Sequence, residues 1–138
     1  MVLFPLPPVQ QAIAGTLQTV QQWYQYFVSL DKTVRSILAS SPNTQTASYT
    51  LQLSDANGIV EMNVAGANNL TVPLNSAIPF QIGTTIRATQ IGAGTTTIIA
   101  TGGVTIRNRS GLNFAGQYAV AFLYKRGTDD WMAYGDLV

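Results

Sequence analysis

The spacing of apolar residues changes once along this chain of 138 residues, near residue 45. Before that point apolar side chains recur at alternating steps of three and four residues, which is typical of a helix with one apolar stripe. After it, short runs of Thr, Val and Ile are separated by Gly and Asn, as in short strands joined by turns. The change predicts an extended arm and helical anchor over residues 1–45, followed by a β-sandwich head domain over residues 46–138.

The first residues, Met1–Pro8, cannot join a helix, because Pro5, Pro7 and Pro8 restrict the backbone and remove hydrogen-bond donors. We expect this arm to lie in a groove on a neighbouring subunit and to use three apolar anchors: Leu3, Phe4 and Leu6. A disordered tail and a proline-rich SH3-type ligand are the alternatives. The segment is too short and too rich in proline for a signal peptide.

A helix is predicted between Val9 and Ser40. Its seam, which we call the heptad stripe, comprises Ile13, Leu17, Val20, Tyr24, Phe27, Asp31, Val34 and Leu38. The stripe fits either an intersubunit coiled coil or one amphipathic helix that packs on its own β domain. Wide aromatic residues favour a three-stranded coiled coil, with Trp23 beside the seam as a further contact. Ser29 and Asp31 are good N-cap residues, so the helix could also break there.

The second part contains candidate strands at 49–53, 59–64, 70–72, 78–81, 85–90, 95–100, 104–107, 118–125 and 131–134. Four glycine-containing turns between strands predict hairpins: Asn57-Gly58, Gly92–Gly94, Gly102-Gly103 and Gly127–Asp130. Many short strands joined by hairpins indicate a mainly β fold, an antiparallel sandwich or barrel. The expected interior residues are Leu51, Leu53, Val60, Val72, Ile78, Phe80, Ile86, Ile98, Val104, Val120 and Phe122. Lys125-Arg126 is interpreted as a solvated turn.

The composition argues against an enzyme. The chain has no histidine and no cysteine, so the commonest general base, the commonest zinc ligand and a thiolate nucleophile are missing. The six carboxylates show no pairing typical of a glycosidase, and Asp55-Ala56-Asn57-Gly58 starts like a calcium loop but lacks its closing glutamate. We therefore expect no catalytic residue, no metal and no cofactor.

Charge and hydropathy limit the partners. The net charge of +1 without a basic cluster argues against nucleic acid, and no apolar run reaches the roughly 18 residues of a membrane span. Only 9% of residues are charged, against about 25% in ordinary soluble domains. A surface so poor in charge suits a chain that is covered by copies of itself or by a neighbour.

Four aromatic residues gather near the end of the sequence: Tyr118, Tyr124, Trp131 and Tyr134. If they are exposed, they could stack on sugar rings or contact a protein partner. If they are buried, they belong to the closing strands of the core, which is the interpretation we favour from the sequence.

Several segments resemble structural proteins of tailed bacteriophages. They are Thr71–Thr84 (TVPLNSAIPFQIGT), the Q-x-G-x-G run Gln90–Gly94, Gly103-Val104-Thr105, and the pattern Gln117-Tyr118-Ala119, Trp131 and Gly135-Asp136-Leu137. The resemblance extends over Tyr49–Leu137, and Gln22-Trp23-Tyr24 is similar to the virion-attachment end of such proteins.

This resemblance implies a virion structural protein with a trimeric β domain, assembled in the host cytoplasm, and it carries over no active-site residue. We expect a homotrimeric capsid cement or decoration protein that binds the coat-protein lattice. The alternatives are a short tail or head fibre that binds a host-surface receptor such as a glycan and, more remotely, a polysaccharide hydrolase.

Overall fold

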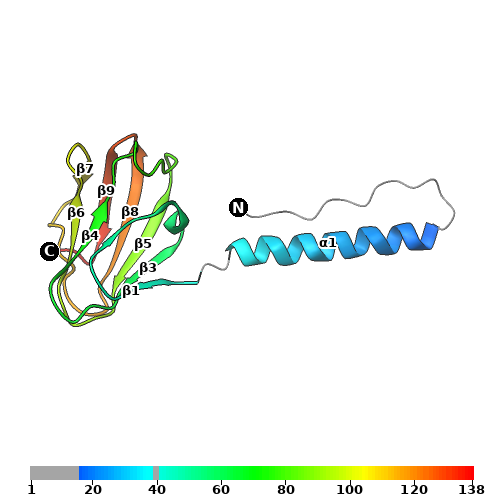
Figure 1. The fold of residues 1–138 in the computed structure, drawn as a ribbon, viewed down its shortest axis with the longest axis horizontal. Helices are drawn as coiled ribbons and strands as arrows, with labels where there is room; N and C mark the ends of the chain where they lie inside the picture. Colours follow the sequence, from blue (N-terminus) through cyan, green and yellow to red (C-terminus); the bar gives the residue numbers. More distant parts are fainter. Residues whose placement is uncertain (1–15, 39–40) are drawn as a thin grey trace. The chain divides into compact units, whose positions relative to one another are not determined.

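The chain divides into two units between Ser40 and Ser41 in a computed structural model that describes residues 16–38 and 41–138. The described part of the first unit is one helix, and the second unit holds all of the described strands (Figure 1). The sheet begins before residue 46, because β1 (Asn43–Gln45) already pairs with β3 (Ile59–Met62). The expected arm anchors Leu3, Phe4 and Leu6, and the first stripe residue Ile13, lie outside the described residues.

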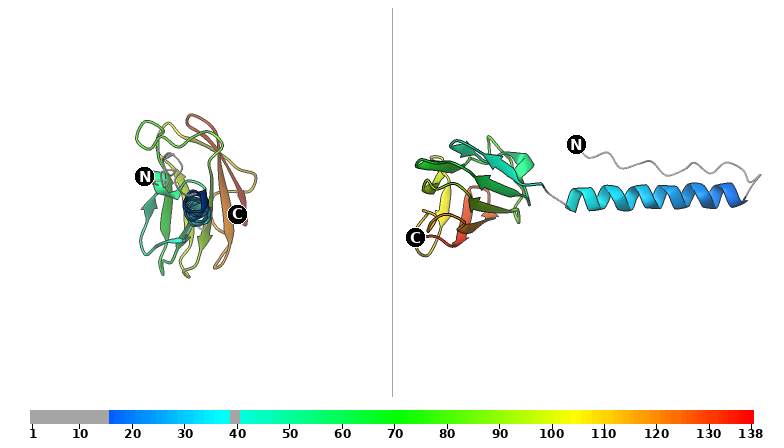
Figure 2. Two further views of the ribbon diagram at one scale, coloured as in Figure 1. Left: turned by 90° about the vertical axis from the view of Figure 1, so that its right-hand side faces the viewer. Right: turned by 90° about the horizontal axis from the view of Figure 1, so that it is seen from below.

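The helix α1 runs without interruption from Thr16 to Leu38. Seen end-on in Figure 2, it projects as a single ring, so its axis is straight. The break expected at Ser29 or Asp31 is wrong. The Ser29 hydroxyl donates to the carbonyl of Tyr26 at 2.8 Å and the Thr33 hydroxyl donates to the carbonyl of Ser29 at 2.9 Å. These hydroxyls bond back to the preceding turn of the same helix and cap no new one.

The second unit is mainly β, as the sequence predicts, with two sheets. The larger has the strand order β1-β3-β5-β8-β9-β7, and the smaller has the order β2-β4-β6. Besides β1 and β3, the strands are β2 (Tyr49–Thr50), β4 (Asn68–Val72), β5 (Thr85–Gln90), β6 (Thr96–Ala100), β7 (Thr105–Arg107), β8 (Val120–Gly127) and β9 (Asp130–Gly135). A short 3-10 turn, η1 (Leu53–Asp55), follows β2, and no strand forms at 78–81.

The pairing of these strands differs from the expected antiparallel arrangement. From β1 to β6 the chain alternates between the two sheets, so β1, β3 and β5 are parallel, as are β2, β4 and β6. The turns at Asn57-Gly58, Gly92–Gly94 and Gly102-Gly103 therefore join strands of different sheets. Only Gly127–Asp130 closes the expected antiparallel hairpin, between β8 and β9. The glycines indicate where the chain turns, but they do not determine which strand the following strand pairs with.

Side chains from both sheets share one apolar interior. Six of the expected interior residues are buried: Leu51, Val60, Val72, Phe80, Ile86 and Ile98. The expectation is wrong for Leu53, which is exposed in η1, and Ile78 and Val104 are only partly buried. It is also wrong for β8, whose inward positions are Ala121, Leu123 and Lys125, so that Val120 and Phe122 face the other way.

Successive turns between the sheets touch one another at two glycines. The N–H of Gly92 donates to the carbonyl of Met62, and the N–H of Gly94 donates to the carbonyl of Val64, both at 3.0 Å. A Cβ atom at Gly94 would lie 2.0 Å from the carbonyl oxygen of Gly66, and one at Gly92 would lie 2.2 Å from that of Val64. Only glycine permits this approach, because any side chain would collide with backbone atoms.

Replacing Gly94 by alanine should therefore lower the free energy of unfolding by about 1–3 kcal/mol, the usual cost of forcing atoms into a packed site. Gly66→Ala is the matched control, because a Cβ at Gly66 meets nothing within 4 Å. Urea unfolding of both variants measures the difference. Equal stability of the two variants would contradict the close contact between the turns.

Candidate interaction surfaces

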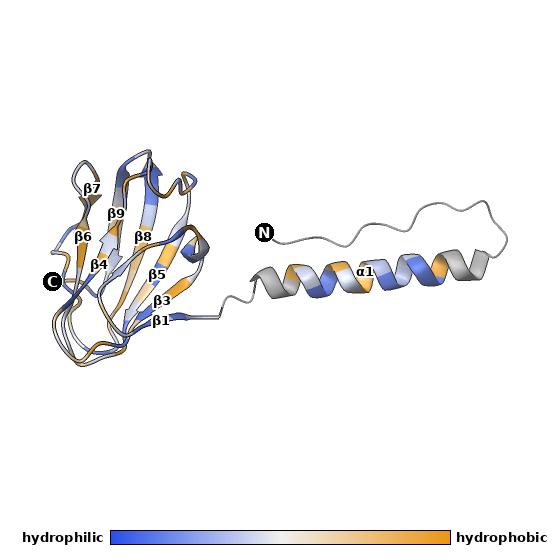
Figure 3. Ribbon diagram, in the orientation of Figure 1, coloured by the Kyte–Doolittle hydropathy of each residue, from blue (hydrophilic) through white to orange (hydrophobic). Residues whose placement is uncertain are grey.

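The heptad stripe is exposed on α1 wherever its side chains are described. Val20, Tyr24 and Phe27 expose 64%, 61% and 58% of their surface, and Val34 is also exposed. Figure 3 shows apolar and polar residues alternating along this helix. The structure places the backbone of Leu17 and Leu38 in α1 as expected. An apolar stripe that alternates with polar residues is typical of a helix that packs against a partner.

Trp23 lies beside the stripe and contacts its own helix. Its ring centroid is 5.8 Å from that of Tyr26 and 5.9 Å from that of Phe27, and the Tyr26 and Phe27 rings are 5.5 Å apart. Because these residues are three and four positions apart, or adjacent, they form a continuous aromatic patch around one turn of the helix. The patch gives the stripe its widest apolar region.

A second apolar surface lies on the outward side of the larger sheet, and we call it the aromatic face: Arg87, Phe122, Tyr124, Met132 and Tyr134. Phe122 is opposite Arg87 on β5 and Tyr134 on β9, and Tyr124 is opposite Met132. The rings of Phe122 and Tyr134 stack, with centroids 5.4 Å apart and planes inclined by 15°. Arginine, aromatic residues and methionine are the side chains enriched in protein interfaces.

The sequence identified only Tyr124 and Tyr134 of this face. Phe122 was expected inside, because Val120–Tyr124 is apolar on both sides of the strand and gives no alternation from which to read its phase. Tyr118, Tyr124 and Tyr134 are exposed, so the favoured interpretation that all four C-terminal aromatics are buried is wrong for these three.

Trp131, by contrast, is buried and unavailable to a partner. Only 1% of its surface is exposed, and its ring meets that of Phe80 edge-on, with centroids 5.5 Å apart. The expectation of buried C-terminal aromatics is thus correct for Trp131. Its candidate role as a partner contact is wrong, because β9 turns its side chain into the shared interior.

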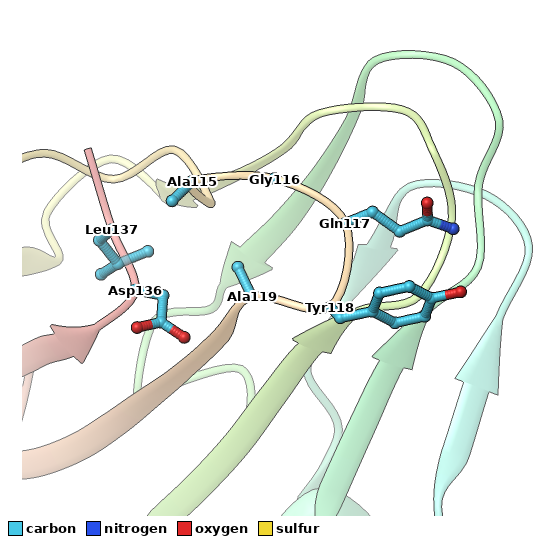
Figure 4. A pocket seen from close by; sticks show the side chains of 7 residues that line it. All are labelled: Ala115, Gly116, Gln117, Tyr118, Ala119, Asp136 and Leu137. Carbon is cyan, nitrogen blue, oxygen red and sulfur yellow. The ribbon is translucent and has the colours of Figure 1, made fainter.

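Tyr118 lies in the loop before β8, beside an open depression of about 400 Å³. The depression is lined by Ala115, Gly116, Gln117, Tyr118, Ala119, Asp136 and Leu137 (Figure 4). Tyr118 has a φ of 68°, which a non-glycine residue rarely adopts, and its N–H donates to the carbonyl of Gln90 at 2.6 Å. Its side chain extends away from Asp136 in Figure 4, so the two do not form a reactive pair.

The carboxylates of the β unit hold the backbone and other side chains. Asp136 accepts from the N–H of Val120 at 3.2 Å, Asp129 accepts from the N–H of Asn75 at 2.7 Å, and Asp130 pairs with Arg107 at 2.9 Å. Glu61 accepts from the hydroxyl of Thr44 at 3.0 Å. Among the described residues, no group of three His, Cys, Asp or Glu side chains could hold a metal ion.

Asp55 is the buried carboxylate of this set, and it joins β1 and β2 to η1. It accepts from Nδ2 of Asn43 at 2.7 Å, from the Tyr49 hydroxyl at 3.0 Å and from the N–H of Gln52 at 2.8 Å. Burial, followed by the hydrogen bond to Asp55, raises the pKa of the Tyr49 hydroxyl above 10.0. The sequence that resembled a calcium loop is thus a turn whose acidic side chain is occupied by protein donors.

This raised pKa predicts a loss of stability at alkaline pH. The unfolded chain releases the Tyr49 proton near pH 10, while the folded chain retains it, so the free energy of unfolding falls as pH rises from about 10 to the raised pKa. Tyr49→Phe should cost about 1 kcal/mol at neutral pH, through the lost hydrogen bond. Its deficit relative to the parent protein should shrink above about pH 10.

Urea unfolding across this pH range measures the deficit. Tyr124→Phe, which removes the hydroxyl of an exposed tyrosine, is the matched control. A Tyr49→Phe deficit that does not change with pH would contradict the assignment.

The two candidate surfaces, the heptad stripe and the aromatic face, are interpreted from the chemistry of their side chains. Within the described ranges, no helix is both long and apolar enough to cross a membrane. No protein-family model, no curated protein and no solved structure matches the chain.

Proposed function

We propose that this chain is a non-enzymatic structural protein of a bacteriophage particle, and that it works as a homotrimeric capsid cement or decoration protein. In this proposal α1 assembles the trimer, while the β unit presents the aromatic face to the coat-protein lattice. The observation that carries the proposal is the exposed heptad stripe on a continuous helix.

The stripe supports self-assembly for an energetic reason. A lone helix is marginal in water, and most helix stability in proteins comes from packing of an apolar face. Phe27 and Tyr24 are more than half exposed in the single chain, so their apolar area is available for burial between helices. Their width fits a three-stranded core better than a tight pair, which is why the proposal specifies a trimer.

Two further observations support a second partner for the assembled protein. The aromatic face is apolar at its centre, carries Arg87 on β5, and is bordered on β7 by Arg107, which lies opposite Met132. Charged residues make up only 9% of the chain, so little of its surface is adapted to remain in water. The resemblance of Thr71–Thr84 and the later motifs to phage structural proteins makes the coat-protein lattice our choice of partner.

Sedimentation of the full chain should give the mass of three chains, and Phe27→Glu should shift it to one. Three glutamates facing each other in a helical core repel and lose their hydration, so the assembly cannot form. Gln22→Glu is the matched control, because Gln22 is exposed on the same helix and lies outside the stripe. A parent protein that sediments as a single chain at micromolar concentration would refute the trimer.

The aromatic face also suits a second candidate function, a short fibre that binds a host-surface receptor, because stacked aromatic rings bind sugars as well as proteins. The two functions differ in what a particle loses with the protein. Particles assembled without a cement protein should lose resistance to heat while still adsorbing to cells. Particles without a receptor-binding fibre should keep that resistance and fail to adsorb.

Tyr134→Ala should weaken binding to the partner, coat lattice or host cell, by about 30-fold, which corresponds to the loss of one hot-spot residue of about 2 kcal/mol. Tyr118→Ala is the control, since Tyr118 is an exposed tyrosine outside the aromatic face. Binding of the purified variants to particles that lack the protein, and to host cells, measures both interactions. Equal binding by the two variants would exclude the aromatic face as the contact surface.

A further inference from the structure

Lys125 has an unusual position, because its side chain lies inside the β unit. It occupies an inward position of β8 and exposes only 1% of its surface, so the expectation of a solvated turn is wrong for this residue. Its Nζ atom donates to Oδ1 of Asn75 and to the carbonyl of Phe80 at 2.9 Å, and it lies 5.7 Å from the centre of the Trp131 ring. The amine thus lies between the Trp131 ring and two carbonyl oxygens.

The surroundings of this amine make it easier to deprotonate than an exposed lysine. No ion pair to Lys125 is found among the described residues, and a buried ammonium without a directly paired carboxylate is costly. Burial lowers the pKa of Lys125, and the nearby charge of Asp129 opposes this effect. A lysine amine desolvated in an apolar site is an activated nucleophile.

Asn75 and Asp129 complete a cluster of three reactive groups. The hydrogen bond to Oδ1 places Nζ of Lys125 beside Cγ of Asn75, the carbon to which that oxygen is bound. The N–H of Asn75 donates to Oδ1 of Asp129 at 2.7 Å, so a carboxylate also lies next to this asparagine. Two reacting groups held in contact react far faster than the same groups free in solution.

We propose that Lys125 and Asn75 form an intramolecular isopeptide bond. The neutral Nζ atom attacks Cγ of Asn75 and forms a C–N bond. The tetrahedral intermediate then expels the amide nitrogen, and the proton lost by Nζ passes to that nitrogen, so one ammonia leaves. The reaction involves no oxidation or reduction and needs no co-reactant. Asp129 acts as the positioning residue, which holds the Asn75 backbone and can relay the proton.

Such a bond would link the β4–β5 connection to β8, across 50 positions of sequence. A cross-link of this length stabilises a fold chiefly by restricting the unfolded chain, as a disulfide does. This chain contains no cysteine, so no disulfide can serve that purpose. The inference rests on the interior of one β unit and stands independently of the proposed role in a virus particle.

Intact-mass measurement of the purified full chain, denatured after incubation at mildly alkaline pH, tests the proposal directly. The mass should be lower than the sequence mass by one ammonia. Trypsin does not cut after an acylated lysine, so digestion should yield one branched species that joins Ser36–Arg87 to Ser110–Arg126. A protein of unchanged sequence mass overturns the proposal, whatever the behaviour of any variant.

Two variants distinguish formation of the isopeptide bond from other reactions that release ammonia. Asparagine can also cyclise on its own backbone and lose the same mass, but that reaction does not need Lys125. Lys125→Arg should therefore restore the full sequence mass, apart from the substitution itself, whereas Lys32→Arg on α1 should still show the loss. Loss of ammonia that persists in Lys125→Arg overturns the proposal.

The role of Asp129 is tested by the pH dependence of the rate of ammonia release. In the parent protein the rate of ammonia loss should rise with pH as Lys125 becomes neutral. Asp129→Asn removes the charge that favours the ammonium, so the rise should move to lower pH while the maximal rate falls through loss of the relay. A variant with the parent pH profile would limit Asp129 to a structural role and remove it from the proposed reaction.

Discussion

The interior shared by the two sheets is the constraint on which the rest of the β unit depends. Because the chain changes sheet after each of the strands β1 to β5, every inward side chain of those strands must fill the same narrow space. The parallel register then brings successive turns into contact, and at Gly94 this contact leaves no room for a Cβ atom. Apolar inward positions and glycine at the stacked turns are two consequences of one arrangement.

Two of the described surfaces outside this interior are apolar, and both have few charges. The heptad stripe lies on α1, and the aromatic face lies on the outward side of β5, β8 and β9. Exposing apolar area of this kind to water is unfavourable, and burying it is favourable. Self-assembly through one surface and attachment through the other is therefore a consistent reason for keeping both in a single chain.

Sequence patterns predicted the elements better than their partners. The strand Thr85–Gln90 is confirmed at both ends, and the helix is confirmed over Thr16–Leu38, because both have strong periodicity. The parallel pairing could not be predicted. Alternation of apolar and polar residues shows which side chains share a side of the sheet, but it does not identify the neighbouring strand. β1 was missed because Asn43–Gln45 is wholly polar.

The candidate surfaces were predictable to different degrees. The heptad stripe follows from spacing alone, whereas the aromatic face depends on the phase of β8, where apolar residues stand on both sides. That phase also decides that Lys125 points inward, since it follows Ala121 and Leu123 at steps of two residues. Lysine is normally found at exposed positions, so its burial here was not expected from the sequence. Its contacts with Asn75, Phe80 and Trp131 explain how the fold accommodates it.

The buried carboxylate of Asp55 has a mechanical consequence. The peptide chain from α1 enters the β unit at β1, so any tension carried along the backbone reaches Asn43 first. The side chain of Asn43 donates a hydrogen bond to Asp55, which also accepts hydrogen bonds from Tyr49 and Gln52. Any force that reaches Asn43 therefore acts on its hydrogen bond to Asp55 as well as on the ladder to β3.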